Sequence, residues 1–211
     1  MFTPALFDFL AELAAHNDKE WFTANTARFE ADVKRPLHSF VAALAPKLAD
    51  IDPMAVCNDK SVFRIYRDTR FSKDKAPYKT HAAAQFVRGA TRGPSGTGYY
   101  LHLEPGRSFF AGGLYLPEPA VAAKIRASID AHPTAWAAAR DVDLMDGEAL
   151  VRVPKPWSAE HPYADDLRRK SFIGRVTFSD NQVVAGGFVD RVAKAAAKLG
   201  PLVHFVDDAA G

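Results

Sequence analysis

The sequence is poor in cysteine. Cys57 is the single thiol among 211 residues, so no disulfide can form within the chain. Proteins without disulfides are typical of reducing compartments. The first eight residues carry no basic segment and already include a carboxylate, Asp8, which argues against a secretory signal peptide. We therefore expect a cytoplasmic protein.

Long apolar runs, internal repeats and low-complexity tracts are also absent. No uncharged apolar run reaches the roughly 18 residues that a membrane helix needs, so no membrane partner is expected. The chain is 48% hydrophobic and 25% charged, and a globular chain of this length buries about 70% of the surface that its unfolded form exposes. We expect one globular domain over residues 1–211.

Several signatures of catalysis and cofactor binding are missing. Gly93, Gly96 and Gly98 do not lead into a helix or a Gly-Lys-Ser/Thr ending, so residues 89–98 are expected to be a hairpin loop rather than a phosphate loop. The seven histidines are scattered and no cysteine pair exists, which argues against zinc. A Gly-x-Ser-x-Gly elbow is absent as well. We expect no metal and no cofactor, and nothing supports covalent catalysis.

Both ends of the chain are predicted to be helical. Apolar residues recur at helical spacing over the first fifty residues, and the stripe continues through Pro36, which predicts a kinked or broken long helix. Further helices are expected over residues 118–131, 133–140 and 180–199, with one or two turns within 163–170. The helix over 180–199 is expected to end at Gly200 and Pro201.

Between these helices the hydrophobic period changes to two, which is typical of half-buried strands. Strands are predicted near residues 61–67, 82–88, 98–104, 108–115 and 172–178, with a short one near 150–153. A Pro-Gly turn at residues 105–106 predicts a hairpin between the third and fourth of these strands. The order of helices, strands and helices predicts an α+β fold. Its sheet is mainly antiparallel and is covered by N-terminal and C-terminal helices.

Positive charge is concentrated in one short segment. Residues 59–81 contain seven Lys and Arg and three Asp, a net charge of +4, whereas the rest of the chain has a net charge of −2. Crowded cations repel one another unless an anion offsets them, and arginine suits phosphate and carboxylate. We therefore predict a pocket for a small phosphorylated or carboxylated ligand. The expected ligand-binding residues are Arg64, Arg67, Arg70, Lys73, Lys75, Tyr78, Lys79 and His81.

Two other interpretations of this segment stay open. The same cations, with Tyr66, Phe71 and Tyr78 available for stacking, suit a nucleic acid. Alternatively, the segment is an internal ion-pair network in a non-catalytic scaffold or interaction protein. This interpretation predicts that Asp68 and Asp74 neutralise the arginines and that no cleft opens beside them.

His102 and Glu104 are the candidate catalytic residues. They lie two positions apart on a predicted strand and therefore share one face with Tyr100. If that face also bears Arg64, a general acid/base group would lie beside the anion site. Cross-strand pairing on an exposed face is the competing explanation. The sequence leaves open whether the protein is an enzyme.

Three segments together point to a known family. The run Asn-Asp-Lys-Glu-Trp-Phe at residues 17–22, residues 63–81 and residues 99–106 resemble the domain of unknown function 2461 family of bacterial and fungal proteins. The resemblance covers nearly the whole chain. It implies a single cytoplasmic domain of unassigned activity, and it supplies no catalytic residues.

Overall fold

The computed structural model describes residues 1–70, 72–89 and 96–211. Its centre is a five-stranded antiparallel sheet in the order β1-β2-β3-β5-β4. The strands are β1 (Ala82–Val87), β2 (Gly98–Leu103), β3 (Ser108–Leu114), β4 (Asp143–Leu144) and β5 (Phe172–Phe178). The predicted α+β class, the antiparallel sheet and the hairpin of β2 and β3 are confirmed. Most of the predicted 89–98 loop, residues 90–95, lies outside the described residues.

The N-terminal helices are α1 (Pro4–Ala15), α2 (Lys19–Ala24) and α3 (Thr26–Arg28), followed by the π-helical turn η1 (Phe29–Lys34) and α4 (Arg35–Ile51). Asp18 caps α2 by accepting a hydrogen bond from the Trp21 N–H at 2.8 Å. Pro36 lies in the first turn of α4, where its missing N–H costs little. The predicted long helix is thus broken, and η1 is the irregular part.

The C-terminal half contributes α5 (Pro119–Ala131), α6 (Pro133–Ala139), α7 (Ala164–Arg168), α8 (Asp180–Val184) and α9 (Phe188–Ala210). The prediction that a helix ends at Gly200 and Pro201 is wrong, because α9 continues through both. Leu199 and Leu202 are fully buried on either side of the proline, and this burial outweighs the hydrogen bond that proline removes. The chain breaks instead at Gly187, whose φ of 77° falls in the left-handed region.

Two predicted strands take another form. In the described residues, segment 61–67 makes isolated bridges, Val62 with Ala84 and Tyr66 with Tyr78, after the short 3₁₀ turn η2 (Asp59–Ser61). The segment leaves the β1 edge early because its later residues pair with residues 77–79 instead. The prediction of a short strand near 150–153 is also wrong. The short strand that pairs with β5 is β4, at Asp143–Leu144.

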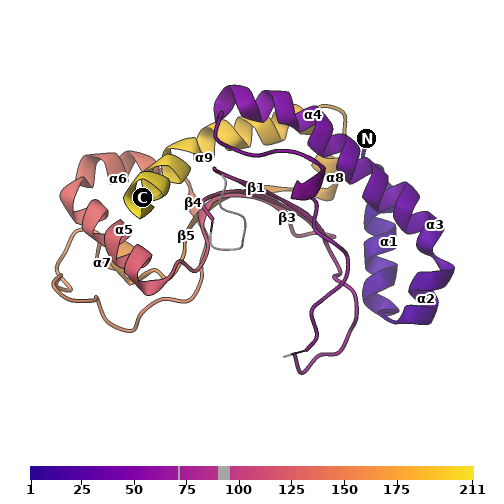
Figure 1. Cartoon of the computed structure of the whole chain (residues 1–211), viewed down its shortest axis with the longest axis horizontal. Coiled ribbons are helices and arrows are strands. Elements are labelled where there is room, and N and C mark those ends of the chain that lie inside the picture. The colour runs from indigo at the N-terminus through magenta and orange to yellow at the C-terminus, as the bar shows by residue number, and fades with distance from the viewer. Residues whose placement is uncertain (71, 90–95) are drawn as a thin grey trace.

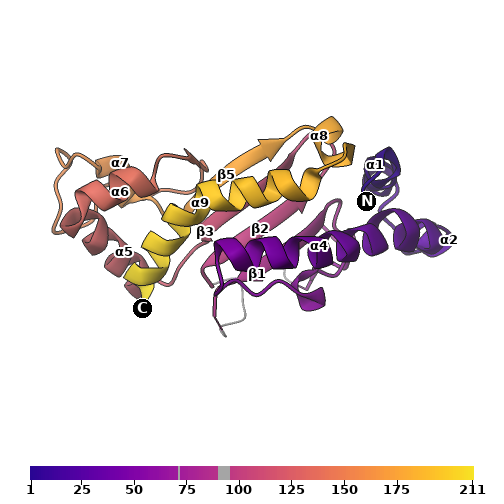
Figure 2. The ribbon, with the colours of Figure 1, turned by 90° about the horizontal axis from the view of Figure 1, so that it is seen from above.

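Helices α4 and α9 lie side by side across one face of the sheet (Figures 1 and 2). Gly112 of β3 permits the close approach of α9, because a Cβ there would lie 2.8 Å from Cγ2 of Val203. No described helix covers the opposite face, which is concave in Figure 1 between α1–α3 at one end and α5–α7 at the other. The segment between η2 and β1 projects on this open side.

Candidate functional site

A cavity of about 280 Å³ lies where η1 and the start of α4 face the segments 62–66 and 79–83. This volume is close to the lower end of the range for small-molecule sites, roughly 300–1,000 Å³. Single π-helical turns inside helices are frequent at functional sites. Apolar side chains form much of the lining, namely Phe22, Phe29, Val33, Leu37, Val62, Phe63 and Ile65.

The charged lining of the cavity has more cations than carboxylates. Lys34, Arg64 and Lys79 line it together with one acid, Glu30, and the Lys34 ammonium lies 2.8 Å from the Glu30 carboxylate. Lys79 donates to the backbone carbonyl of Arg64 at 2.9 Å. Burial and the nearby Arg64 guanidinium lower the pKa of Lys79. Lys79 is half-buried, and a half-buried cation beside a second cation is the situation that an anion relieves.

His81 forms part of the same wall. Its ring centroid lies 4.3 Å from that of His102, and in the described residues no hydrogen bond involves a ring nitrogen of His81. Burial, reinforced by His102, lowers the pKa of His81 to about 4. His81 is therefore a neutral imidazole at neutral pH, in a cavity that also contains Arg64 and Lys79.

Tyr100, His102 and Glu104 form a hydrogen-bonded chain on the open face of the sheet. The Tyr100 hydroxyl lies 3.2 Å from Nδ1 of His102, and Nε2 of His102 lies 3.2 Å from a Glu104 carboxylate oxygen. Because the carboxylate accepts, Nε2 carries the proton and Nδ1 accepts from the tyrosine. Phe109 stacks on the imidazole with centroids 4.8 Å apart. The three side chains share one face, as strand alternation predicts.

Two groups of this hydrogen-bonded chain, Tyr100 and His102, have shifted pKa values. Burial raises the pKa of Tyr100 to about 12. Burial also lowers the pKa of His102, against the opposing effect of Glu104. His102 and Glu104 do not line the cavity, and their link to it is His81, which lines the cavity and contacts His102. A catalytic role for His102 and Glu104 stays a prediction.

Two of the predicted ligand-binding arginines are paired with neighbouring aspartates. Nη1 of Arg67 lies 2.5 Å from Asp74, and Nη2 of Arg70 lies 2.7 Å from Asp68. A second, more open hollow of about 600 Å³ runs along these arginines and along Arg64. The ion pairs agree with the scaffold interpretation, whereas the hollow beside them does not.

Three other predicted residues, Lys73, Lys75 and Tyr78, line neither space. Lys75 donates to the Thr69 carbonyl at 2.9 Å. Tyr78 is 4% exposed and its ring stacks on Phe22 with centroids 4.1 Å apart, so it packs in the core. Phe71, a stacking residue in the nucleic-acid interpretation, lies outside the described residues. Of the eight predicted residues, the 280 Å³ cavity therefore brings together Arg64, Lys79 and His81.

The sequence analysis missed the helical wall of the cavity. Glu30 and Lys34 of η1 and His38 of α4 line it, and these residues lie 21 to 29 positions before the start of the cationic segment at residue 59. The signal available in the sequence was Pro36 within a continuous apolar stripe, which predicts a kinked or broken helix but says nothing about the partner of that helix. Only the tertiary fold places η1 against residues 62–66.

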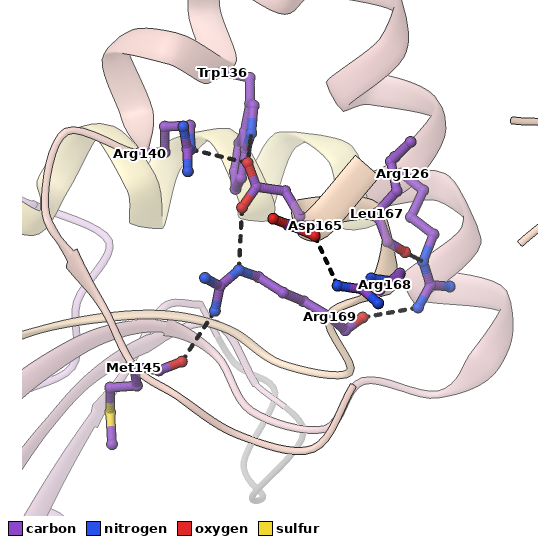
Figure 3. A network of polar contacts seen from close by, with 9 residues as sticks. Arg126, Trp136, Arg140, Met145, Asp165, Leu167, Arg168 and Arg169 are labelled. Atoms are coloured by element: carbon purple, nitrogen blue, oxygen red, sulfur yellow. Dashed lines mark hydrogen bonds and ion pairs between the residues drawn. The ribbon is translucent and has the colours of Figure 1, made fainter. Parts of the chain in front are cut away.

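A second arginine-rich cluster surrounds Asp166 of α7. Figure 3 shows its partners Trp136, Arg140 and Arg169. The Asp166 carboxylate accepts hydrogen bonds from Nε1 of Trp136 at 2.9 Å and from Nε of Arg169 at 3.1 Å. Nε of Arg140 lies 2.9 Å from the same carboxylate. Arg169 also donates to the Met145 carbonyl at 3.0 Å. All of these donors bind acceptors of the protein itself, namely the Asp166 carboxylate and the Met145 carbonyl. The cluster therefore connects α6, α7 and the segment after β4.

Comparison with known protein families identifies a match over most of the chain. A family model described as "Conserved hypothetical protein (DUF2461)" matches residues 5–205, and no curated protein matches the chain. In the part of the chain that the structure describes, no three His, Cys, Asp or Glu side chains are grouped to hold a metal ion. None of the described helices is both long enough and apolar enough to cross a bilayer.

Proposed function

The chain belongs to the DUF2461 family of conserved hypothetical proteins, and we propose that it binds a small anion with an apolar body in the cavity beside η1. One observation carries this proposal: Arg64 and Lys79 line a cavity whose other walls are largely apolar. Guanidinium and ammonium groups recognise carboxylate and phosphate. The ligand we expect is therefore a cytoplasmic carboxylate or phosphate ester.

The charges of the cavity favour an anion over a neutral ligand. Glu30 already pairs with Lys34 at 2.8 Å, which leaves Arg64 and Lys79 as the arginine and lysine of the lining without a carboxylate partner among the described residues. Burial and Arg64 together disfavour the charged form of Lys79. An anion between the two cations replaces this repulsion with two attractive contacts.

The aromatic lining favours a ligand with an apolar body over a bare inorganic ion. Phe22, Phe29, Phe63 and Tyr66 contribute to the cavity. Phe63 and Tyr66 are 42% and 58% exposed, and exposed apolar groups beside a pocket are typical of binding sites. A ring or a branched chain would cover these surfaces, while its anionic group reaches Arg64.

Single-stranded nucleic acid is the second candidate ligand. The hollow of about 600 Å³ places Phe63 and Tyr66 beside Arg64, Arg67 and Arg70. Aromatic platforms beside a cationic groove are the usual means of binding single strands. Affinity for such a ligand falls steeply with salt because counterions are released.

A thermal-shift experiment tests the proposal. The panel contains benzoate, benzenesulfonate and phenyl phosphate, with neutral benzyl alcohol, inorganic phosphate and an oligothymidylate as comparisons, at low and moderate salt. We expect the aryl anions to raise the melting temperature by mass action and benzyl alcohol to leave it unchanged. A salt-sensitive shift with the oligonucleotide alone would favour nucleic acid instead, and no shift with any compound would favour the scaffold.

Two double variants with the same change in charge locate the site. Replacement of Arg64 and Lys79 by alanine removes two cations from the cavity, whereas replacement of Lys73 and Lys75 removes two cations of the same segment that lie outside it. We expect the first variant to lose the shift and the second to keep it. The proposal is wrong if the folded Arg64/Lys79 variant keeps the shift.

A further inference from the structure

The cavity contains an imidazole whose nitrogens make no hydrogen bond to another described residue. His81 lines the wall near Arg64 and Lys79, and its ring rests on that of His102. It is thus available to a ligand from the same space as the two cations. The other charged or titratable groups around it are Glu104 and Arg107 on the sheet side, and Glu30, Lys34 and His38 on the helical wall.

Two other histidines near the cavity already have partners. The ring of His102 is held on both sides, by Tyr100 at Nδ1 and by Glu104 at Nε2. Nδ1 of His38 lies 3.1 Å from the Asp59 carboxylate. His81 is therefore the histidine of the described cavity lining whose protonation an incoming anion would affect most.

The protein surroundings of this imidazole favour its neutral form. Burial, His102, Lys79 and Arg107 all lower the pKa of His81, and Glu104 alone opposes them. An anion within about 4–6 Å has the opposite effect, because it favours the charged form of a base and raises its pKa by about 1–3. An anion held by Arg64 and Lys79 enters the space that His81 lines.

We propose that the cavity binds its anion together with one proton, and that His81 is the residue that receives it. The proton comes from solvent and adds to a ring nitrogen of His81, and no covalent bond to the ligand forms or breaks. This inference rests on the proposed anion site and adds a third positive group to it. Because binding linkage is reciprocal, protonation of His81 strengthens anion binding by the same factor by which the anion strengthens protonation.

The linkage predicts a specific pH dependence of affinity. Between the pKa of His81 in the empty cavity and its higher value in the complex, the association constant rises about tenfold for each unit by which the pH falls. A rise in pKa of about 1–3 gives a total gain of about 10-fold to 1,000-fold. Above this range of pH the affinity becomes independent of pH.

Titration calorimetry with benzenesulfonate tests the inference. This anion keeps its charge from about pH 5 to about pH 8, so any proton taken up on binding goes to the protein. Measurement in two buffers of different ionisation enthalpy gives the number of protons bound. With a free pKa of about 4 and a rise of about 1–3, we expect uptake of about 0.4–0.9 proton per bound anion near about pH 5 and less than about 0.1 near about pH 8.

Variants identify the residue that takes the proton. His81→Gln removes the titrating group and should abolish uptake, whereas the distant His132→Gln should retain it. Uptake that persists in His81→Gln, or that disappears in His132→Gln, would overturn the assignment. Binding to the wild-type protein without uptake would also overturn it and leave the anion site intact, whereas absence of binding would refute the anion site itself.

Discussion

The protein has two arginine-rich regions that differ in the burial of their carboxylates. Around Asp166, one carboxylate with a 2% exposed side chain collects Trp136, Arg140 and Arg169. In the segment before β1, the side chains of Asp68 and Asp74 are 60% and 65% exposed, and the ion pairs join each of them to one arginine. The number of arginines therefore does not distinguish a structural cluster from a binding site.

Burial decides what each region can do. Removing one partner of a buried ion pair leaves an uncompensated charge, so the Asp166 cluster is fixed by the fold. Exposed pairs contribute only about 0–1 kcal/mol, so a ligand can replace them at little cost. Arg64 and Lys79 can bind an anion without breaking an ion pair, because their hydrogen bonds and ion pairs among the described residues include no carboxylate. The cationic segment at residues 59–81 is thus the region in which a ligand anion can replace the aspartates as a partner of the cations.

Substitution of Asp166 should have the largest effect on stability. Asp166→Asn removes the charge opposite Arg140 and Arg169 and is expected to lower the free energy of unfolding by about 3 kcal/mol, the lower end of the range for a broken buried pair. Both arginines keep contact with water, since their side chains are 41% and 22% exposed. Urea unfolding measures the change.

The neighbouring residue supplies the control. Asp165 pairs with Arg168, but its side chain is 87% exposed. Asp165→Asn should therefore change the free energy of unfolding by no more than about 0.5 kcal/mol. Equal effects of the two substitutions would show that burial does not separate the regions.

Substitution of one arginine in each region should separate stability from ligand binding. Arg169→Ala removes hydrogen bonds to Asp166 and to the Met145 carbonyl, which should cost about 2 kcal/mol of stability and leave binding of benzenesulfonate unchanged. Arg64→Ala removes an exposed side chain and should cost at most about 0.5 kcal/mol, but it should weaken binding at least about tenfold, a typical loss for one charged contact. Unfolding and calorimetry on both variants test this, and a loss of both properties in either one would contradict it.

The pH dependence of stability reveals the neutral imidazole in the cavity. The folded pKa of His81, about 4, lies below its ordinary value of 6.5, so the unfolded chain takes up the proton first. Stability is then fully present above about pH 6.5 and is lost as the pH falls toward about pH 4. His81→Gln should reduce the loss between about pH 7 and about pH 5 by about 1–2 kcal/mol, allowing for partial exposure. An unchanged loss in urea unfolding would show that His81 is not buried as a neutral group.

The fold could be predicted from the sequence wherever the pattern is local. The alternation of Tyr99, Leu101 and Leu103 defines β2, and the Pro-Gly turn after it defines the hairpin. Local signals failed where tertiary packing decides the outcome. Gly200 and Pro201 read as a helix end, yet the buried face of α9 continues past them.

The site was less predictable than the fold, for the same physical reason. Charge density marks the segment that contains Arg64, Lys79 and His81, but the periodicity of that segment does not show which cations meet. Arg67 and Arg70 pair with nearby aspartates, a contact that the sequence allows but does not require. The wall that η1 contributes depends on contacts between residues far apart in the chain, which no local pattern encodes.

The smallest expected effect concerns these exposed aspartates. The double variant Asp68→Asn and Asp74→Asn leaves backbone acceptors for the arginines, such as the Ala76 carbonyl, which lies 3.2 Å from Nη1 of Arg67. The two exposed pairs should together contribute less than about 1 kcal/mol to the free energy of unfolding, measured in urea.

The variant raises the net charge of the segment by two, so its binding to an oligothymidylate should increase and should depend more steeply on salt. Affinity for benzenesulfonate should change far less, because neither aspartate is among the residues that line the cavity beside η1. A stability loss as large as that of Asp166→Asn would instead make this segment a second structural ion-pair network, and the difference between the two arginine-rich regions would disappear.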